Sequence, residues 1–232
     1  MYFYGIDVYY IVLVVPALIF AMWAQIRVSS AFSRYSQMRT EGGLTGADAA
    51  RLILDRNGLT NVAVELTEGR LSDHYDPRAE VIRLSREVYY NATVAAVGVA
   101  AHECGHAVQH AEEYFPLRVR SAIIPVTQIG SKLAFPLFLL GLLFSYPPLM
   151  DAGILLFALV AVFQLVTLPV EYNASSRAVA TLSGSGMVSA EEERGVRKVL
   201  SAAALTYVAA LATALANLLR LILIAGRRNN RN

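Results

Sequence analysis

Long apolar runs alternate with polar segments along this chain. Residues 8–26 form one apolar run, and residues 123–146, 149–170 and 199–219 form three more, with Lys132 as a charge inside the second. A helix that crosses the hydrocarbon core of a bilayer needs about 20 predominantly apolar residues. The pattern therefore predicts about four transmembrane helices, and a lysine's long stem can carry its charge towards the membrane surface.

The basic residues next to the first run predict its orientation. Residues 1–7 contain none, whereas Arg27, Arg34 and Arg39 follow the run. This order argues against a cleaved signal peptide and favours an uncleaved anchor with its N-terminus outside and the next segment in the cytosol. With four complete spans the C-terminal end, which contains Arg227, Arg228 and Arg231, would also lie outside. Basic residues are usually found on the cytosolic side, so it stays open whether the last helix crosses completely.

The segment 27–122 has a different periodicity. Residues 45–57 have a helical pattern, residues 62–66 and 80–84 alternate like short strands, and residues 93–109 are again compatible with a helix. The predicted fold class is therefore a mainly α, multi-span membrane protein with a small α+β module. The expected parts are an anchor (1–26), this module (27–122), a transmembrane pair (123–170), a connecting helical segment (171–198) and a last transmembrane helix with a basic tail (199–232).

Composition agrees with a membrane protein. The hydrophobic share is 56%, whereas soluble proteins usually have about 45–50%. A lipid bilayer is therefore an expected partner. The formal net charge is only +2, so nothing in the composition points to nucleic acid. The single cysteine, Cys104, excludes an intrachain disulfide and fits a reducing compartment. Nothing in the composition defines an oligomeric state.

The helical segment before residue 110 contains the motif H-E-x-x-H. His102 and His106 are one turn apart, so on a helix both imidazoles can reach one metal ion. Glu103 lies beside them, where it can take a proton from a metal-bound water. Zinc suits such a site because it accepts imidazole and, with three protein ligands, leaves one coordination position open. A helix whose histidines merely face solvent is the alternative, but the apolar residues before His102 argue against it.

Several residues could be considered as the third ligand. His110 would lie about 12 Å along the helix from His102, too far for one zinc ion. The metzincin spacing fails because Gln109 and Glu112 stand where glycine and histidine are required. Asp151 matches a site-2 protease segment only loosely, and one span would place it on the opposite membrane side. His74 and Asp76 precede the helix in a turn-like segment and are weak candidates.

Glu171 is the strongest candidate. It follows an apolar run, and two spans separate it from His106, so it returns to the same membrane side. On a helix Glu171 shares a face with Ser175, whose hydroxyl could hold a ligand in place. The alternative is an interfacial carboxylate paired with Arg177.

Four stretches, at residues 71–77, 95–103, 169–175 and 198–208, carry a resemblance to a known family. In these stretches the chain resembles the YugP-like neutral zinc metallopeptidases, an integral-membrane family of bacteria. The layout is also similar to that of the wider gluzincin membrane peptidases, which implies that the small α+β module at residues 27–122 is zincin-like. The resemblance implies that His102, His106 and Glu171 bind Zn²⁺ and that Glu103 is catalytic. The wider pattern has aspartate where this chain has Ser175.

The sequence therefore predicts a zinc metallopeptidase of the bacterial plasma membrane, with its active site facing the cytosol. A peptide or membrane-protein substrate could lie along an edge strand at residues 80–84, and Tyr172 or Arg177 could stabilise the oxyanion. Two alternatives stay open: a site-2-like intramembrane protease that uses Asp151, and a non-catalytic, zinc-stabilised membrane scaffold. An intact Glu103 argues against the scaffold, because a structural zinc site needs no base.

Overall fold

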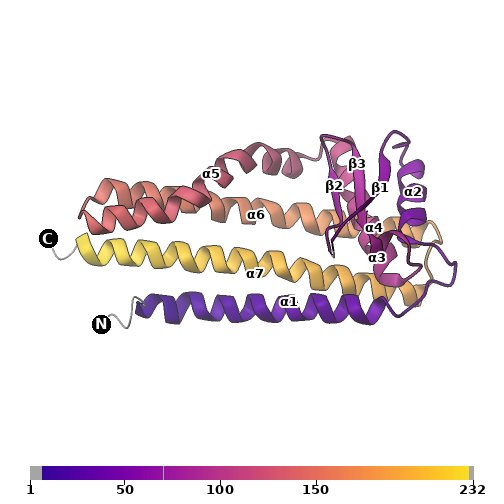
Figure 1. The fold of residues 1–232 in the computed structure, drawn as a ribbon, viewed down its shortest axis with the longest axis horizontal. Coiled ribbons are helices and arrows are strands. Elements are labelled where there is room, and N and C mark those ends of the chain that lie inside the picture. The colour runs from indigo at the N-terminus through magenta and orange to yellow at the C-terminus, as the bar shows by residue number, and fades with distance from the viewer. Residues whose placement is uncertain (1–6, 70, 230–232) are drawn as a thin grey trace. The chain divides into compact units, whose positions relative to one another are not determined.

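The computed structural model describes residues 7–69 and 71–229, and it is mainly helical (Figure 1). The chain divides into two compact units. The helical unit comprises residues 7–24, 119–168 and 205–229, and the mixed unit comprises residues 25–118 and 169–204. The elements are η1 (Tyr10–Val14), α1 (Val15–Tyr35), α2 (Gly46–Arg56), β1 (Ala63–Thr67), β2 (His74–Asp76), β3 (Val81–Ser85), α3 (Arg86–Tyr89), α4 (Val94–Ala111), α5 (Phe115–Leu143), α6 (Pro147–Gly184) and α7 (Ala190–Asn229).

Within the part of the chain that the structure describes, four helical segments are long and apolar enough to cross a membrane. They are Tyr10–Tyr35, Phe115–Leu143, Pro147–Gly184 and Ala190–Arg227. Each of these segments includes one of the four apolar runs of the sequence or most of it. The prediction of a mainly α, multi-span fold with a small α+β module is confirmed.

The helices are longer than the apolar runs that predict them. Helix α1 continues to Tyr35, beyond the apolar run that ends at residue 26, and α6 continues beyond Glu171 to Gly184 without a break. The continuation of α6 remains helical because Ala178 and Leu182 are buried in the core of the mixed unit. The same helix thus supplies both an apolar span and the segment that carries the candidate third ligand.

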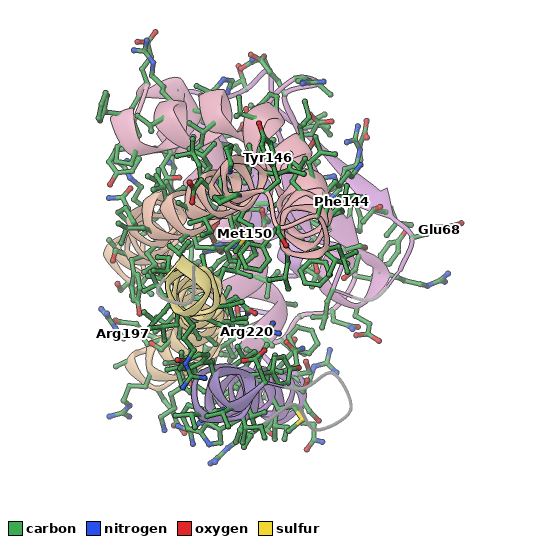
Figure 2. All side chains as sticks on the ribbon, turned by 90° about the vertical axis from the view of Figure 1, so that its left-hand side faces the viewer. Glu68, Phe144, Tyr146, Met150, Arg197 and Arg220 are labelled. Atoms are coloured by element: carbon green, nitrogen blue, oxygen red, sulfur yellow. The ribbon has the colours of Figure 1, made fainter. Side chains whose placement is uncertain are left out.

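In the helical unit, side chains from three helices meet in a small apolar cluster. Phe138 of α5, Met150 of α6 and Leu221 of α7 are its buried members; Met150 and Arg220 are labelled in Figure 2, which looks along the helices. Arg220 also donates two hydrogen bonds, of 2.8 and 2.6 Å, to Oδ2 of Asp7. This partly buried ion pair joins the beginning of the described chain to the last helix.

The mixed unit contains a three-stranded sheet in the order β1-β3-β2. Strand β1 pairs with β3 in parallel, and β2 pairs with β3 antiparallel. Two predictions from the sequence are wrong. Residues 80–84 do not form an edge, because β3 is the central strand, and the segment around His74 and Asp76 is a strand rather than a turn. Three residues are too few for an alternating pattern to show.

The core of the mixed unit forms around α4. Thr93 precedes the helix and accepts a hydrogen bond of 3.3 Å from the backbone amide of Ala96, a normal N-cap arrangement. Gly105 allows α6 to come close, because a Cβ atom at that position would lie 2.6 Å from the carbonyl oxygen of Ala174. This contact brings side chains of α6 to the face of α4 that carries the histidines.

Candidate metal centre

Helix α4 presents two histidines on one face. His102 and His106 are four residues apart, so the helical repeat places them one above the other. Their ring centroids are 4.8 Å apart and the ring planes are at 81°. Both side chains are mostly buried, with 15% and 12% of their surface exposed. The spacing of the motif therefore produces a pair of adjacent, largely dehydrated imidazoles.

Glu171 of α6 faces this pair. Its Oε2 lies 3.3 Å from Nε2 of His102 and 3.5 Å from Nε2 of His106, and only 3% of its side chain is exposed. Among the residues that the structure describes, His102, His106 and Glu171 form the group able to hold a metal ion, with ligand atoms within 4.8 Å of one another. Packing of α6 against α4 thus brings together residues that are far apart in the sequence.

The distances in this group fit zinc. In tetrahedral coordination with bonds of about 2.0–2.1 Å, ligand atoms lie about 3.3–3.4 Å from one another. The two distances from Glu171 to the imidazole nitrogens are close to that separation. Two nitrogens and one carboxylate oxygen are also a donor set that zinc prefers. The residues present therefore fit the metal that the motif implies.

The electrostatics of the site favour a cation. Burial by itself lowers the pKa of His106, but a hydrogen bond that the imidazole donates to the Glu171 carboxylate and the negative charge of Glu103 outweigh it, so the pKa is raised overall. Carboxylates that stabilise a charged imidazole produce a negative potential at the same point. A divalent cation would experience that potential as well.

Each imidazole is also held through its second nitrogen. Nδ1 of His102 lies 3.1 Å from the hydroxyl of Ser175, and Nδ1 of His106 lies 3.0 Å from Oε1 of Gln109. The contact with Ser175 was expected from its position on the face of Glu171. The contact with Gln109 was not predicted, although the position of Gln109 three residues after His106 on the same helix is a signal for it.

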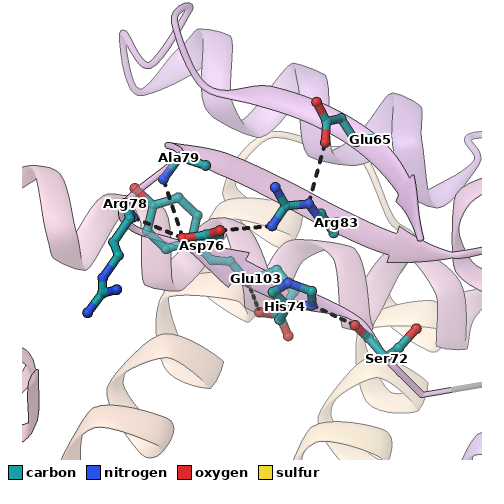
Figure 3. A network of polar contacts seen from close by, with 9 residues as sticks. Glu65, Ser72, His74, Asp76, Arg78, Ala79, Arg83 and Glu103 are labelled. Atoms are coloured by element: carbon teal, nitrogen blue, oxygen red, sulfur yellow. Dashed lines mark hydrogen bonds and ion pairs between the residues drawn. The ribbon is translucent and has the colours of Figure 1, made fainter. Parts of the chain in front are cut away.

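Glu103 lies on α4 next to the histidines and is 8% exposed. Its Oε2 accepts a hydrogen bond of 3.0 Å from the backbone amide of Tyr75, in strand β2 (Figure 3). Tyr75 also places its hydroxyl 2.9 Å from Nδ1 of His110. Strand β2 therefore orients one oxygen of the candidate base through a backbone group and contacts the end of α4 through a side chain.

The remaining sequence candidates have other surroundings. His74 is exposed, with Nδ1 2.7 Å from the carbonyl oxygen of Ser72, and Asp76 binds Arg83 and caps the turn that follows (Figure 3). Asp151 lies exposed on α6 in the helical unit. These three residues and His110 all lie outside the metal-binding group of the described residues.

The two residues considered for the oxyanion also lie on α6. Tyr172 is half-exposed, at 48%. Arg177 donates to Oδ1 of Asn173 at 2.7 Å and pairs with Glu112 at 2.7 Å. Their role in stabilising an oxyanion stays a prediction.

Comparison with known proteins gives a family whose description agrees with the metal-binding group. The model of the family described as "Putative neutral zinc metallopeptidase" matches residues 10–226. A relative from Bacillus subtilis (strain 168), named "Putative membrane protease YugP", is 50% identical over 215 residues, which are 93% of this chain and 96% of the relative. No solved structure shows a significant match. The match over nearly the whole chain means that this protein belongs to the neutral zinc metallopeptidase family.

Proposed function

We propose that this protein is a membrane-embedded, zinc-dependent peptidase that hydrolyses peptide bonds at the cytosolic face of the bacterial plasma membrane. One observation carries the proposal: the Nε2 atoms of His102 and His106 converge on the Glu171 carboxylate, with Glu103 next to them on the same helix. Zinc held there would lower the pKa of a water molecule and polarise the scissile carbonyl.

In this proposal Glu103 is the general base. The amide of Tyr75 donates to Oε2, which leaves Oε1 able to accept the proton of the attacking water. The same carboxyl then delivers that proton to the leaving amine. Because the backbone of β2 positions the carboxylate, Glu103 does not depend on a mobile side chain for its orientation.

An extended peptide would lie along β2 rather than β3. Strand β3 has neighbours on both sides, whereas β2 is an edge strand, and its Tyr75 contacts Glu103. Edge strands bind extended peptides through backbone hydrogen bonds. The proximity of β2 to the proposed base thus supports a peptide or a segment of a membrane protein as substrate.

The decisive test is Glu103→Gln. The amide keeps the shape of the side chain but cannot accept a proton, so zinc content should stay at the parent level while hydrolysis of a casein-like or membrane substrate falls by about 10²–10⁴-fold. Equal turnover by parent and variant would refute the role of Glu103. Parent protein that binds zinc but cleaves no substrate would favour the zinc-stabilised scaffold.

The orientation has a separate test. Cysteines replace Arg34 or Pro147 in a Cys104→Ala background, and intact cells are treated with a membrane-impermeant thiol reagent. With the N-terminus outside, position 147 is labelled and position 34 is protected until the cells are opened. The reverse pattern would place the active site on the outer face.

A further inference from the structure

Gln109 is a fully buried side chain that is absent from the H-E-x-x-H motif. Its amide nitrogen donates to the carbonyl oxygen of Val170 at 2.8 Å and to Oδ1 of Asn173 at 2.9 Å. Its amide oxygen lies 3.0 Å from Nδ1 of His106. Both ends of the amide therefore have polar partners, and one of the partners is a candidate metal ligand.

The direction of this amide is determined by its surroundings. The carbonyl of Val170 can only accept, so the nitrogen of Gln109 must face it. Asn173 leads to the same result, because Nε of Arg177, which can only donate, lies 2.7 Å from its Oδ1. The oxygen that Asn173 presents to Arg177 is the same atom that Gln109 approaches with its nitrogen.

It follows that Oε1 of Gln109 must face His106. An amide oxygen can only accept, so the proton of that hydrogen bond lies on Nδ1 of His106. Nε2, which is 3.5 Å from the Glu171 carboxylate, is then the nitrogen left to bind a metal. The contact of His102 with Ser175 carries no such direction, because a hydroxyl can donate or accept.

We propose that Gln109 is a positioning residue that holds the Nδ1 proton of His106 and thereby prepares Nε2 for zinc. Asn173 and Arg177 act behind it by keeping the amide in one orientation, and Glu112 holds Arg177 through an ion pair of 2.7 Å. The inference rests on the proposed zinc-dependent function, but it concerns metal affinity and can be tested without any substrate.

The experiment measures the zinc dissociation constant of the purified full-length protein by competition with a chelating dye. Gln109→Met keeps the length of the side chain and removes both polar atoms, so affinity should fall about 10–100-fold, the usual effect of losing a partner of a metal-bound histidine. The absorption spectrum of the Co²⁺-loaded variant should also change, because one imidazole is no longer oriented. Gln37→Met, at an exposed glutamine in the turn after α1, is the matched control and should bind zinc like the parent.

Two variants of Asn173 separate orientation from simple loss of packing. Asn173→Asp can still accept from both Gln109 and Arg177, so it should retain the parent affinity and cobalt spectrum. Asn173→Leu has a similar volume but accepts neither hydrogen bond. It should weaken zinc binding less than Gln109→Met does, because the Val170 carbonyl still orients the amide. If Gln109→Met does not fold, as judged by circular dichroism, the two Asn173 variants decide the question.

The outcomes distinguish this inference from the proposed function. Parent-like zinc affinity and cobalt spectrum in Gln109→Met would overturn the role of Gln109 while leaving the peptidase proposal intact. Equal losses in Asn173→Asp and Asn173→Leu would also overturn it, because packing alone would then explain the effect. A parent protein that binds no zinc would overturn both. Parent-like hydrolysis by Glu103→Gln refutes the proposed base without changing the expectation for Gln109.

Discussion

The backbone amide of Tyr75 in β2 donates a hydrogen bond of 3.0 Å to the carboxylate of Glu103 in α4, so two residues 28 positions apart in the chain meet at the proposed base. The donor is part of the main chain, and its position depends on the pairing of β2 with β3. The small sheet thus has a direct connection to the candidate chemistry: it orients the carboxylate next to the histidines.

The contribution of this backbone donor can be measured with two substitutions. Tyr75→Pro removes the N–H, and since this N–H points away from β3 the edge strand should tolerate proline. A hydrogen bond to a charged group is worth about 1.5–3 kcal/mol, so kcat should fall roughly 10–100-fold with zinc content unchanged. Tyr75→Phe keeps the N–H and loses only the contact of the hydroxyl with His110, so it should retain most activity. Equal effects of the two variants would assign the role to the side chain.

The third ligand is tested by a pair of carboxylate substitutions. Glu171→Ala leaves two histidines, so zinc affinity should fall by more than the roughly 10–100-fold typical of residues that act through a ligand. Asp151→Ala should leave zinc content at the parent level, because Asp151 is outside the metal-binding group of the described residues. Zinc is quantified by metal analysis after a chelator challenge. Full occupancy in Glu171→Ala together with loss in Asp151→Ala would support the site-2-like alternative.

The close approach of α4 and α6 predicts a stability effect at Gly105. In Gly105→Ala the new methyl group would lie 2.6 Å from the backbone oxygen of Ala174, and backbone cannot move aside as easily as a flexible side chain. Overpacking of this kind costs about 1–3 kcal/mol. We expect a lower melting temperature in detergent and weaker zinc binding, since Glu171 would shift with α6. Gly42→Ala, with no atom within 4 Å of the added carbon, should show neither effect.

The raised pKa of the Asp73 carboxyl predicts how the stability of the fold depends on pH. Burial raises the pKa of this carboxyl, and the charge of Glu103 adds to the increase, although the amide and hydroxyl of Ser85 oppose it. Because the folded pKa lies above the unfolded value, the unfolding free energy should decrease as pH rises from the unfolded pKa, near 4, through the folded one.

Asp73→Asn removes that titration. Its melting temperature, relative to the parent, should therefore rise as pH increases across the same window. The comparison uses metal-free protein, so that zinc release at low pH does not contribute. A parent–variant difference that stays constant with pH would mean that the folded state does not raise this pKa.

Much of the architecture could be predicted from local pattern. Apolar runs of membrane-spanning length predicted four long helices, and the i, i+4 spacing of His102 and His106 predicted that their imidazoles share a helix face. Glu171 could be selected by counting two spans back to the same side, and the structure places it 3.3 and 3.5 Å from the two imidazole nitrogens. The helices and the shared face could be predicted because length, composition and helical repeat are properties of short stretches of chain. The role of Glu171 as a ligand stays a prediction that its position supports.

The partners of the site residues depended on tertiary structure. Gln109 contacts Val170 across 61 residues, and Tyr75 contacts Glu103 from a strand of three residues whose pairing with β3 makes it part of the sheet. No periodicity specifies such contacts. The first requires the close packing of α4 against α6, which Gly105 allows, and the second requires the position of β2 beside α4. The sequence alone identified Glu103, His102, His106 and Glu171 as the candidate base and zinc ligands, because motif and helical spacing are local, while tertiary packing decided which groups hold these residues in position.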